Sequence, residues 1–124
     1  MPTPRDLSIY GIDTALGLRQ LDADLSLYYR FLSAFTGDDS ADRLRSAIAC
    51  GDAKAAFERA HELKGLTAQL GLVRLSARAD ALCDALRDFR ADSALSQARS
   101  LLPGLLRAHR QALRAIALLD AIDA

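Results

Sequence analysis

The chain has 124 residues, the size of a single domain that can bury its own core. Its sixteen basic and sixteen acidic residues cancel and are mixed along the sequence, which argues against a nucleic-acid-binding or anionic-membrane surface. No apolar run approaches the roughly 18 residues of a membrane span, and the first residues lack a signal-peptide core, so we expect a cytoplasmic protein. Cys50 and Cys83 are too few for a disulfide framework, and we expect both thiols to be reduced and mostly buried.

The hydrophobic period is helical along nearly the whole chain, and no segment alternates as a strand would. We expect Asp13 to cap a short first helix that runs through Leu21, with Ile12 before it as a hydrophobic staple. Asp22 or Asp24 then starts a second helix. Its apolar positions recur at three- and four-residue spacing: Leu25, Tyr28, Leu32 and Phe35.

Two interruptions divide the middle of the chain. The segment TGDDS, residues 36–40, predicts a break or a kink, after which the helix resumes and continues to Cys50. A Gly-Asp pair at residues 51–52 then ends that helix and caps the next one. The third long helix is expected over about residues 53–70, where Gly71 ends it.

A fourth helix is expected over about residues 73–89, and Asp92 or Ser93 caps a last helical stretch. Residues 103–104, a Pro-Gly pair, must kink or interrupt that last helix. Short connections between long amphipathic helices favour antiparallel neighbours. We therefore expect one domain over residues 1–124, an all-α, up-down-up-down four-helix bundle with a short extra N-terminal helix. The apolar stripe of the fourth helix is Leu75, Ala79, Leu82, Leu86 and Phe89.

The third helix carries His61 on the side away from its core stripe. On a wheel of about 100° per residue, His61 points roughly 140° from the middle of that stripe, so the ring should be exposed. Gly65 lies one turn further on, where glycine lowers the stability of a helix by about 1 kcal/mol relative to Ala. This cost suggests that Gly65 clears space for a partner. Lys64 favours negative charge arriving there, as a nitrogen that accepts a phosphoryl group requires. The core stripe is Ala56, Ala60, Leu63, Thr67 and Leu70.

The segment HELKG, residues 61–65, is followed by Gly71 and Leu75, and this pattern closely resembles histidine-containing phosphotransfer (HPt) domains. Three upstream segments share the resemblance: GID at 11–13, YRFLSAF at 29–35 and GD at 51–52. The motif-bearing core therefore spans about residues 12–89, with a compatible last helix over about 92–122. The fold expected from the residue pattern agrees with the helical bundle that this family implies.

The resemblance implies that His61 is the phosphorylated histidine, that Lys64 lies near the phosphoryl group and that Gly65 gives steric access. In the family the phosphoryl group usually sits on Nε2, while a hydrogen bond from the fourth helix holds Nδ1. The family often places Gln or Glu 22 residues after the histidine, where this chain has Cys83, and a thiol is a poor hydrogen-bonding partner. Either Glu58 orients the ring instead, or the ring is held less firmly.

The resemblance also implies that the chain is not an enzyme on its own. The receiver domain of a response regulator supplies the catalytic machinery and its Mg²⁺, and the chain itself needs no cofactor or metal. His61 would take the phosphoryl group from a receiver aspartate, for example of a hybrid sensor histidine kinase, and pass it to a second one. We expect a monomer that docks through an apolar patch with a polar rim. The candidate docking residues are Phe57, Glu58, Ala68 and Leu72, with Lys64 and Arg74 at the rim.

Three other functions remain open at this stage. The phosphoacceptor domain of a chemotaxis-type histidine kinase shares the motif, but its usual run of small residues after the KG is replaced here by LTAQL. A metal-carrying bundle needs several inward-facing His or carboxylates, and this chain has two His. A non-phosphorylated helical interaction module would leave His61 idle. We expect His109 to be an ordinary solvated residue of the last helix.

Overall fold

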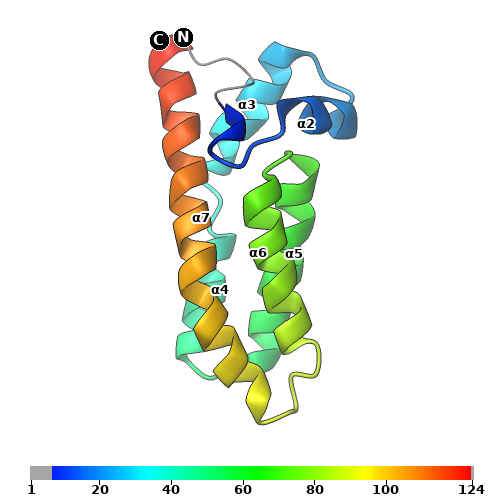
Figure 1. Ribbon diagram of the computed structural model, residues 1–124, viewed down its shortest axis with the longest axis vertical. Helices are drawn as coiled ribbons and strands as arrows, with labels where there is room; N and C mark the ends of the chain where they lie inside the picture. Colours follow the sequence, from blue (N-terminus) through cyan, green and yellow to red (C-terminus); the bar gives the residue numbers. More distant parts are fainter. Residues whose placement is uncertain (1–6, 124) are drawn as a thin grey trace.

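The computed structural model describes residues 7–123, with side chains up to Leu119. Within this range all regular structure is helical, and no helix is both long enough and apolar enough to span a bilayer. The helices are α2 (Thr14–Leu21), α3 (Leu25–Phe35), α4 (Ser40–Ala49), α5 (Ala53–Gln69), α6 (Val73–Leu86) and α7 (Ser93–Asp123) (Figure 1). The expected all-helical fold is confirmed.

Helices α4, α5, α6 and α7 form a bundle along the long axis of the molecule (Figure 1). α5 packs between α4 and α6, α6 packs between α5 and α7, and α4 also contacts α7. α3 packs against α2 and α7, and α2 also contacts α5, so these two helices cover one end of the bundle. α5 and α6 thus form the pair whose outer faces carry the candidate site.

Aspartates cap three of the helices, as the sequence indicates. Each carboxylate accepts a hydrogen bond from the backbone N–H three residues later. The bonds are Leu16 to Asp13 (3.0 Å), Leu27 to Asp24 (2.8 Å) and Ala55 to Asp52 (3.1 Å). Asp22 instead ends α2 with a left-handed backbone, φ 48°. The staple is wrong, because the fourth helical position of α2 is Gly17, which has no side chain to meet Ile12.

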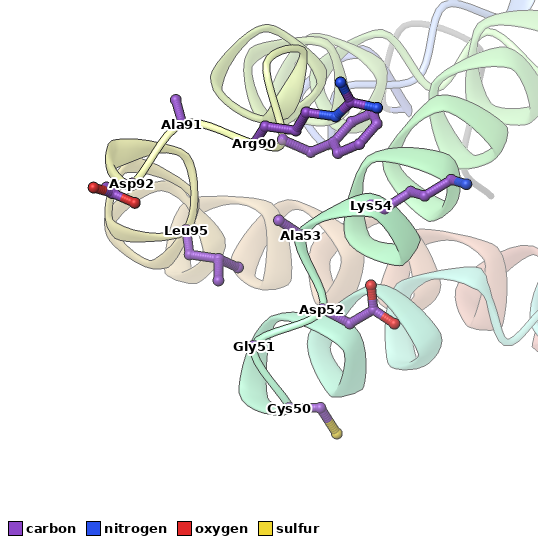
Figure 2. Close-up of a pocket in the computed structure, with 10 residues that line it drawn as sticks. Cys50, Gly51, Asp52, Ala53, Lys54, Arg90, Ala91, Asp92 and Leu95 are labelled. Carbon is purple, nitrogen blue, oxygen red and sulfur yellow. The ribbon is translucent and has the colours of Figure 1, made fainter.

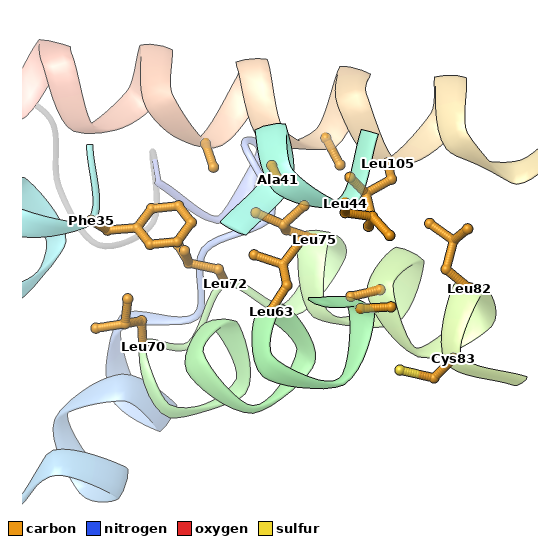
Figure 3. Close-up of a cluster of buried hydrophobic side chains, with 14 of the residues drawn as sticks. Phe35, Ala41, Leu44, Leu63, Leu70, Leu72, Leu75, Leu82, Cys83 and Leu105 are labelled. Atoms are coloured by element: carbon orange, nitrogen blue, oxygen red, sulfur yellow. The ribbon is translucent and has the colours of Figure 1, made fainter. Parts of the chain in front are cut away.

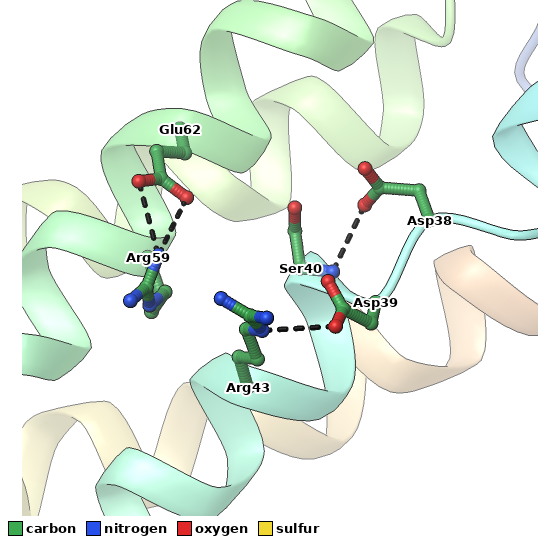
Figure 4. Close-up of polar contacts among 6 residues, drawn as sticks. All are labelled: Asp38, Asp39, Ser40, Arg43, Arg59 and Glu62. Carbon is green, nitrogen blue, oxygen red and sulfur yellow. Dashed lines mark hydrogen bonds and ion pairs between the residues drawn. The ribbon is translucent and has the colours of Figure 1, made fainter.

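The helix boundaries differ from the expected ones at two places. The break over residues 36–40 is confirmed, since α3 ends at Phe35 and α4 begins at Ser40, whose N–H donates to Asp38 (Figure 4). α6 ends at Leu86, three residues before the expected end at 89. α7 continues through Pro103, so of the two outcomes expected there the interruption is wrong, while the kink stays a prediction. Leu105 after the proline is fully buried, and core packing of this kind compensates for the backbone hydrogen bond that proline removes.

The core contains leucines from all four bundle helices and from the turn between α5 and α6 (Figure 3). The predicted core stripe of α5 is confirmed, since each of its five residues is at most 4% exposed. Packing of that stripe fixes the rotation of α5 about its axis. As a result, the opposite side of α5, which carries His61, faces solvent.

A tightly packed region, which we call the α2 corner, consists of Gly17, Tyr28, Leu70 and Gly71. The Tyr28 hydroxyl donates to the Leu70 carbonyl at 2.6 Å, and the Asp13 N–H donates to the Gly71 carbonyl at 2.7 Å. Gly71 has a φ of +73°, and a Cβ there would collide with the Asp13 carbonyl oxygen. Burial, followed by the charge of Asp13, raises the pKa of Tyr28. The corner fixes the turn that leads from α5 into α6.

Candidate functional site

His61 is exposed on the outer face of α5. Its ring lies against that of Phe57, one turn earlier, with the two centroids 6.2 Å apart and the planes at 38°. Within the part of the chain that the structure describes, neither ring nitrogen has a hydrogen-bond partner. The predicted outward direction of His61 is therefore confirmed, and its nitrogens are open to an incoming group.

Gly65 lies next to His61 along the helix and is also exposed. A Cβ added there would have no atom within 4 Å outside the local helix backbone. The packing of this chain therefore does not require glycine at this position. What the glycine preserves is open space beside the imidazole, as the access hypothesis requires.

Lys64 is held by a carboxylate that the sequence reasoning missed. Its Nζ lies 2.8 Å from Oδ1 of Asp80 on α6, and both side chains are about half exposed. The hydrogen bond to Asp80, followed by the charge of Asp80, raises the pKa of Lys64. Only the register of α6 against α5 brings these two residues together, and no local motif in the sequence encodes that register.

Cys83 is 1% exposed and lies in the core, so the expected burial of this thiol is confirmed (Figure 3). This burial raises the pKa of the thiol. Among the described residues, neither Cys83 nor Glu58 forms a hydrogen bond with the His61 ring. The two alternatives, that Glu58 orients the ring or that the ring is held less firmly, therefore both stay predictions.

Leu72 cannot belong to a docking patch, because its side chain is fully buried. It precedes α6 and turns into the core (Figure 3). The next residue, Val73, is 40% exposed and lines a cleft of about 290 Å³ together with Ala68 and the Lys64–Asp80 pair. An exposed apolar position therefore exists one residue after the expected one, since consecutive residues at a helix start point in different directions.

Phe89 is a second surface residue that the sequence reasoning missed. Because α6 ends at Leu86, Phe89 does not continue the buried stripe but lies half-buried, 6.4 Å from the Phe57 ring. The guanidinium of Arg90 lies 6.0 Å from the centre of the Phe89 ring. A row of rings thus runs from His61 over Phe57 to Phe89. Phe89 also lines a cleft of about 570 Å³, whose wall includes Arg90 and Leu95 (Figure 2).

Three further expectations need correction. Cys50 is exposed, because it follows the last turn of α4, and it lines the same cleft (Figure 2). Arg74 does not face the site, since it donates to Gln111 of α7 and to the Ile9 carbonyl. His109 is half-buried with its ring edge-on to Phe35, and burial lowers its pKa.

In the described residues no three His, Cys, Asp or Glu side chains lie close enough together to hold a metal ion.

The family comparison agrees with this geometry. The sequence model of the Hpt domain family matches residues 35–123, from the end of α3 through α7, and includes His61. The upstream segments 11–13 and most of 29–35 lie outside that match. Searches of curated proteins and of solved structures found no significant match. Since the family match covers well over half of the chain, this protein belongs to the Hpt domain family, the histidine phosphotransfer modules of two-component phosphorelays.

Proposed function

We propose that His61 accepts a phosphoryl group from the aspartate of one receiver domain and passes it to the aspartate of another. The observation that carries this proposal is the exposed imidazole with empty space at Gly65. His109 is less suited to the role, because its ring is half-buried against Phe35. Transfer requires an attacking nitrogen that a second protein can reach, and His61 meets that requirement.

In the proposed step, the lone pair of an unprotonated His61 nitrogen attacks the phosphorus of an aspartyl phosphate. The N–P bond forms while the P–O bond to the aspartate breaks, and the bonding electrons leave with the carboxylate. The Mg²⁺ that neutralises the phosphoryl oxygens belongs to the receiver domain, so the chain needs no cofactor of its own. The reverse step, on a second receiver, restores the free imidazole.

The proposed docking face is the outer side of α5 and α6 around His61. Phe57 and Phe89 supply apolar surface on one side, and Ala68 and Val73 supply it on the other. Glu58 and Lys64 supply charge at the rim. Val73 and Phe89 replace the buried Leu72 in this surface, and an apolar centre with a charged rim is the usual composition of a transient interface.

We also infer that α4 to α7 follow the antiparallel up-down-up-down order. The packing of each helix against its neighbour in sequence supports this order. So do the short connections at residues 50–52 and 70–72, which leave no length for a crossover. In that order, the site faces outward from the middle of α5.

The proposal is tested by incubating the chain with candidate receivers labelled at their aspartates. We expect rapid transfer of label to the chain, in an acid-labile and alkali-stable form, as a phosphoramidate bond requires. His109→Gln is the control and should be labelled like the wild type. Receivers that bind the chain without transferring label would instead indicate an interaction module with an idle histidine and would contradict the proposal.

A further inference from the structure

The Lys64–Asp80 ion pair differs from the other ion pairs in the described part of the chain. Arg43–Asp39, Arg45–Asp42, Arg59–Glu62 and Arg87–Asp84 join residues three or four positions apart, as Figure 4 shows for the first and third of them. Lys64–Asp80 joins α5 to α6. It is also the pair whose cation lies one helical turn from His61.

The Lys64–Asp80 contact is short, but both side chains are solvated, so the ammonium can exchange Asp80 for another anion. The Nζ of Lys64 lies 2.8 Å from Asp80 Oδ1, while 42% and 47% of the two side chains remain exposed. A solvated pair of this kind contributes little to stability, so a stronger anion nearby can displace the carboxylate. The four-carbon stem of lysine allows its ammonium to move to such an anion without a change in the helix.

A phosphoryl group on His61 would be that anion. Residues three positions apart on a helix have Cβ atoms about 5–6 Å apart, within reach of a lysine side chain. The dianionic phosphoryl group attracts the ammonium more strongly than one carboxylate does. It also repels Asp80, whose carboxylate lies 2.8 Å from the Lys64 ammonium and carries the same sign of charge as the phosphoryl group.

Resting on the proposed function, we propose that Asp80 is a positioning residue that acts through Lys64. In the unphosphorylated chain it holds the ammonium away from the imidazole, and in the phosphorylated chain it competes with the phosphoryl group for that ammonium. Asp80 neither gains nor loses a bond in the transfer: the N–P bond of phospho-His61 breaks towards the next aspartate, and the imidazole regains its lone pair. The effect of Asp80 is to destabilise phospho-His61 and so to favour release of the phosphoryl group.

The test uses phosphoramidate, a small-molecule donor, so that no receiver is needed. The chain is phosphorylated at His61, and the rate at which phosphohistidine disappears is measured for the wild type, Asp80→Asn and Asp80→Glu. We expect Asp80→Asn to lengthen the lifetime roughly twofold to fivefold, as loss of one competing surface charge allows. Asp80→Glu keeps the charge and should restore most of the wild-type rate.

Two controls isolate the route through Lys64. Asp84→Asn removes a carboxylate one turn further along α6, which pairs with Arg87 and acts on Lys64 more weakly than Asp80 does, so it should change the lifetime less than Asp80→Asn. In a Lys64→Ala background, Asp80→Asn should lose most of its effect. An Asp80→Asn lifetime equal to that of the wild type, or an undiminished effect in the Lys64→Ala background, would overturn the inference. Absence of any label in the wild-type chain would instead contradict the proposed function itself.

Discussion

Two glycines inside helices, Gly65 of α5 and Gly17 of α2, carry the same intrinsic helix penalty but lie in opposite surroundings. At Gly17 a Cβ would lie 2.5–2.7 Å from ring atoms and the hydroxyl of Tyr28. At Gly65 a Cβ would have no atom within 4 Å outside the local helix backbone. The first glycine makes room for a buried ring of this chain, whereas no other described residue fills the space beside the second.

The comparison separates two roles that look identical in the sequence. Gly71, the second glycine of the motif, belongs with Gly17, because its positive φ and its contact with Asp13 are both internal to the chain. Of these three glycines, only Gly65 has no internal role. The hypothesis that Gly65 serves function therefore rests on the empty space around it, because glycine alone also occurs at the two structural positions.

The largest expected effect is at the α2 corner. Gly17→Ala should lower the free energy of unfolding by about 1–3 kcal/mol, because Tyr28 is fully buried and cannot move away without losing its hydrogen bond to Leu70. Urea unfolding of the wild type and the variant measures the difference. A Gly17→Ala variant as stable as the wild type would remove the contrast between the two glycines.

Gly65→Gln should affect transfer but not folding. The longer side chain would fill the space beside His61, so the rate of phosphoryl transfer from a labelled receiver should fall on the order of tenfold or more. Single-turnover transfer, together with a urea unfolding curve, checks both parts. If Gly65→Gln transfers at the wild-type rate, steric clearance is not the reason for this glycine.

Gly65→Ala gives the smaller, opposite change in stability. Because an added methyl group meets no neighbour, the variant should be more stable than the wild type by up to about 1 kcal/mol. The same urea measurement checks this value and serves as the matched control for Gly17→Ala. A loss of stability would show that Gly65 has a packing role that its surroundings do not reveal.

The smallest expected effect concerns the second histidine. Burial lowers the pKa of His109 in the folded chain, so the stability that its neutral form supports is present above about pH 6.5 and is lost as the pH falls further. Between about pH 7 and about pH 5 the wild type should therefore lose more stability than His109→Gln. Equal losses in the two proteins would mean that burial of this ring does not affect its protonation.

Local signals predicted the helices and their caps well, because Asp13, Asp24 and Asp52 act within three residues of their partners. The exposed position of His61 followed from the helical period alone. The end of α6 did not, since Phe89 continues the apolar spacing although the chain leaves the helix at Leu86. Pro103 does not interrupt α7, because packing of that helix outweighs the local penalty of the proline.

Contacts of the site that depend on how two helices pack together could not be predicted from the sequence. The Lys64–Asp80 pair requires the register of α5 against α6, which no local pattern predicts. The prediction of Leu72 as a docking residue was wrong for a different reason. Leu72 lies just outside a helix, where no helical period predicts which way the side chain points, and it is buried. The sequence thus predicts His61 as the candidate phosphoacceptor, whereas the contacts around it depend on tertiary packing.

The most direct test of the account maps the phosphorylated residue after a single transfer from a labelled receiver. His61→Gln and His109→Gln each remove one imidazole, and circular dichroism checks that helix content is intact in both. We predict that His61→Gln carries no label, while His109→Gln is labelled to the wild-type level. Label that persists at full level in His61→Gln, or that disappears in His109→Gln, would contradict the assignment of His61 as the phosphoacceptor.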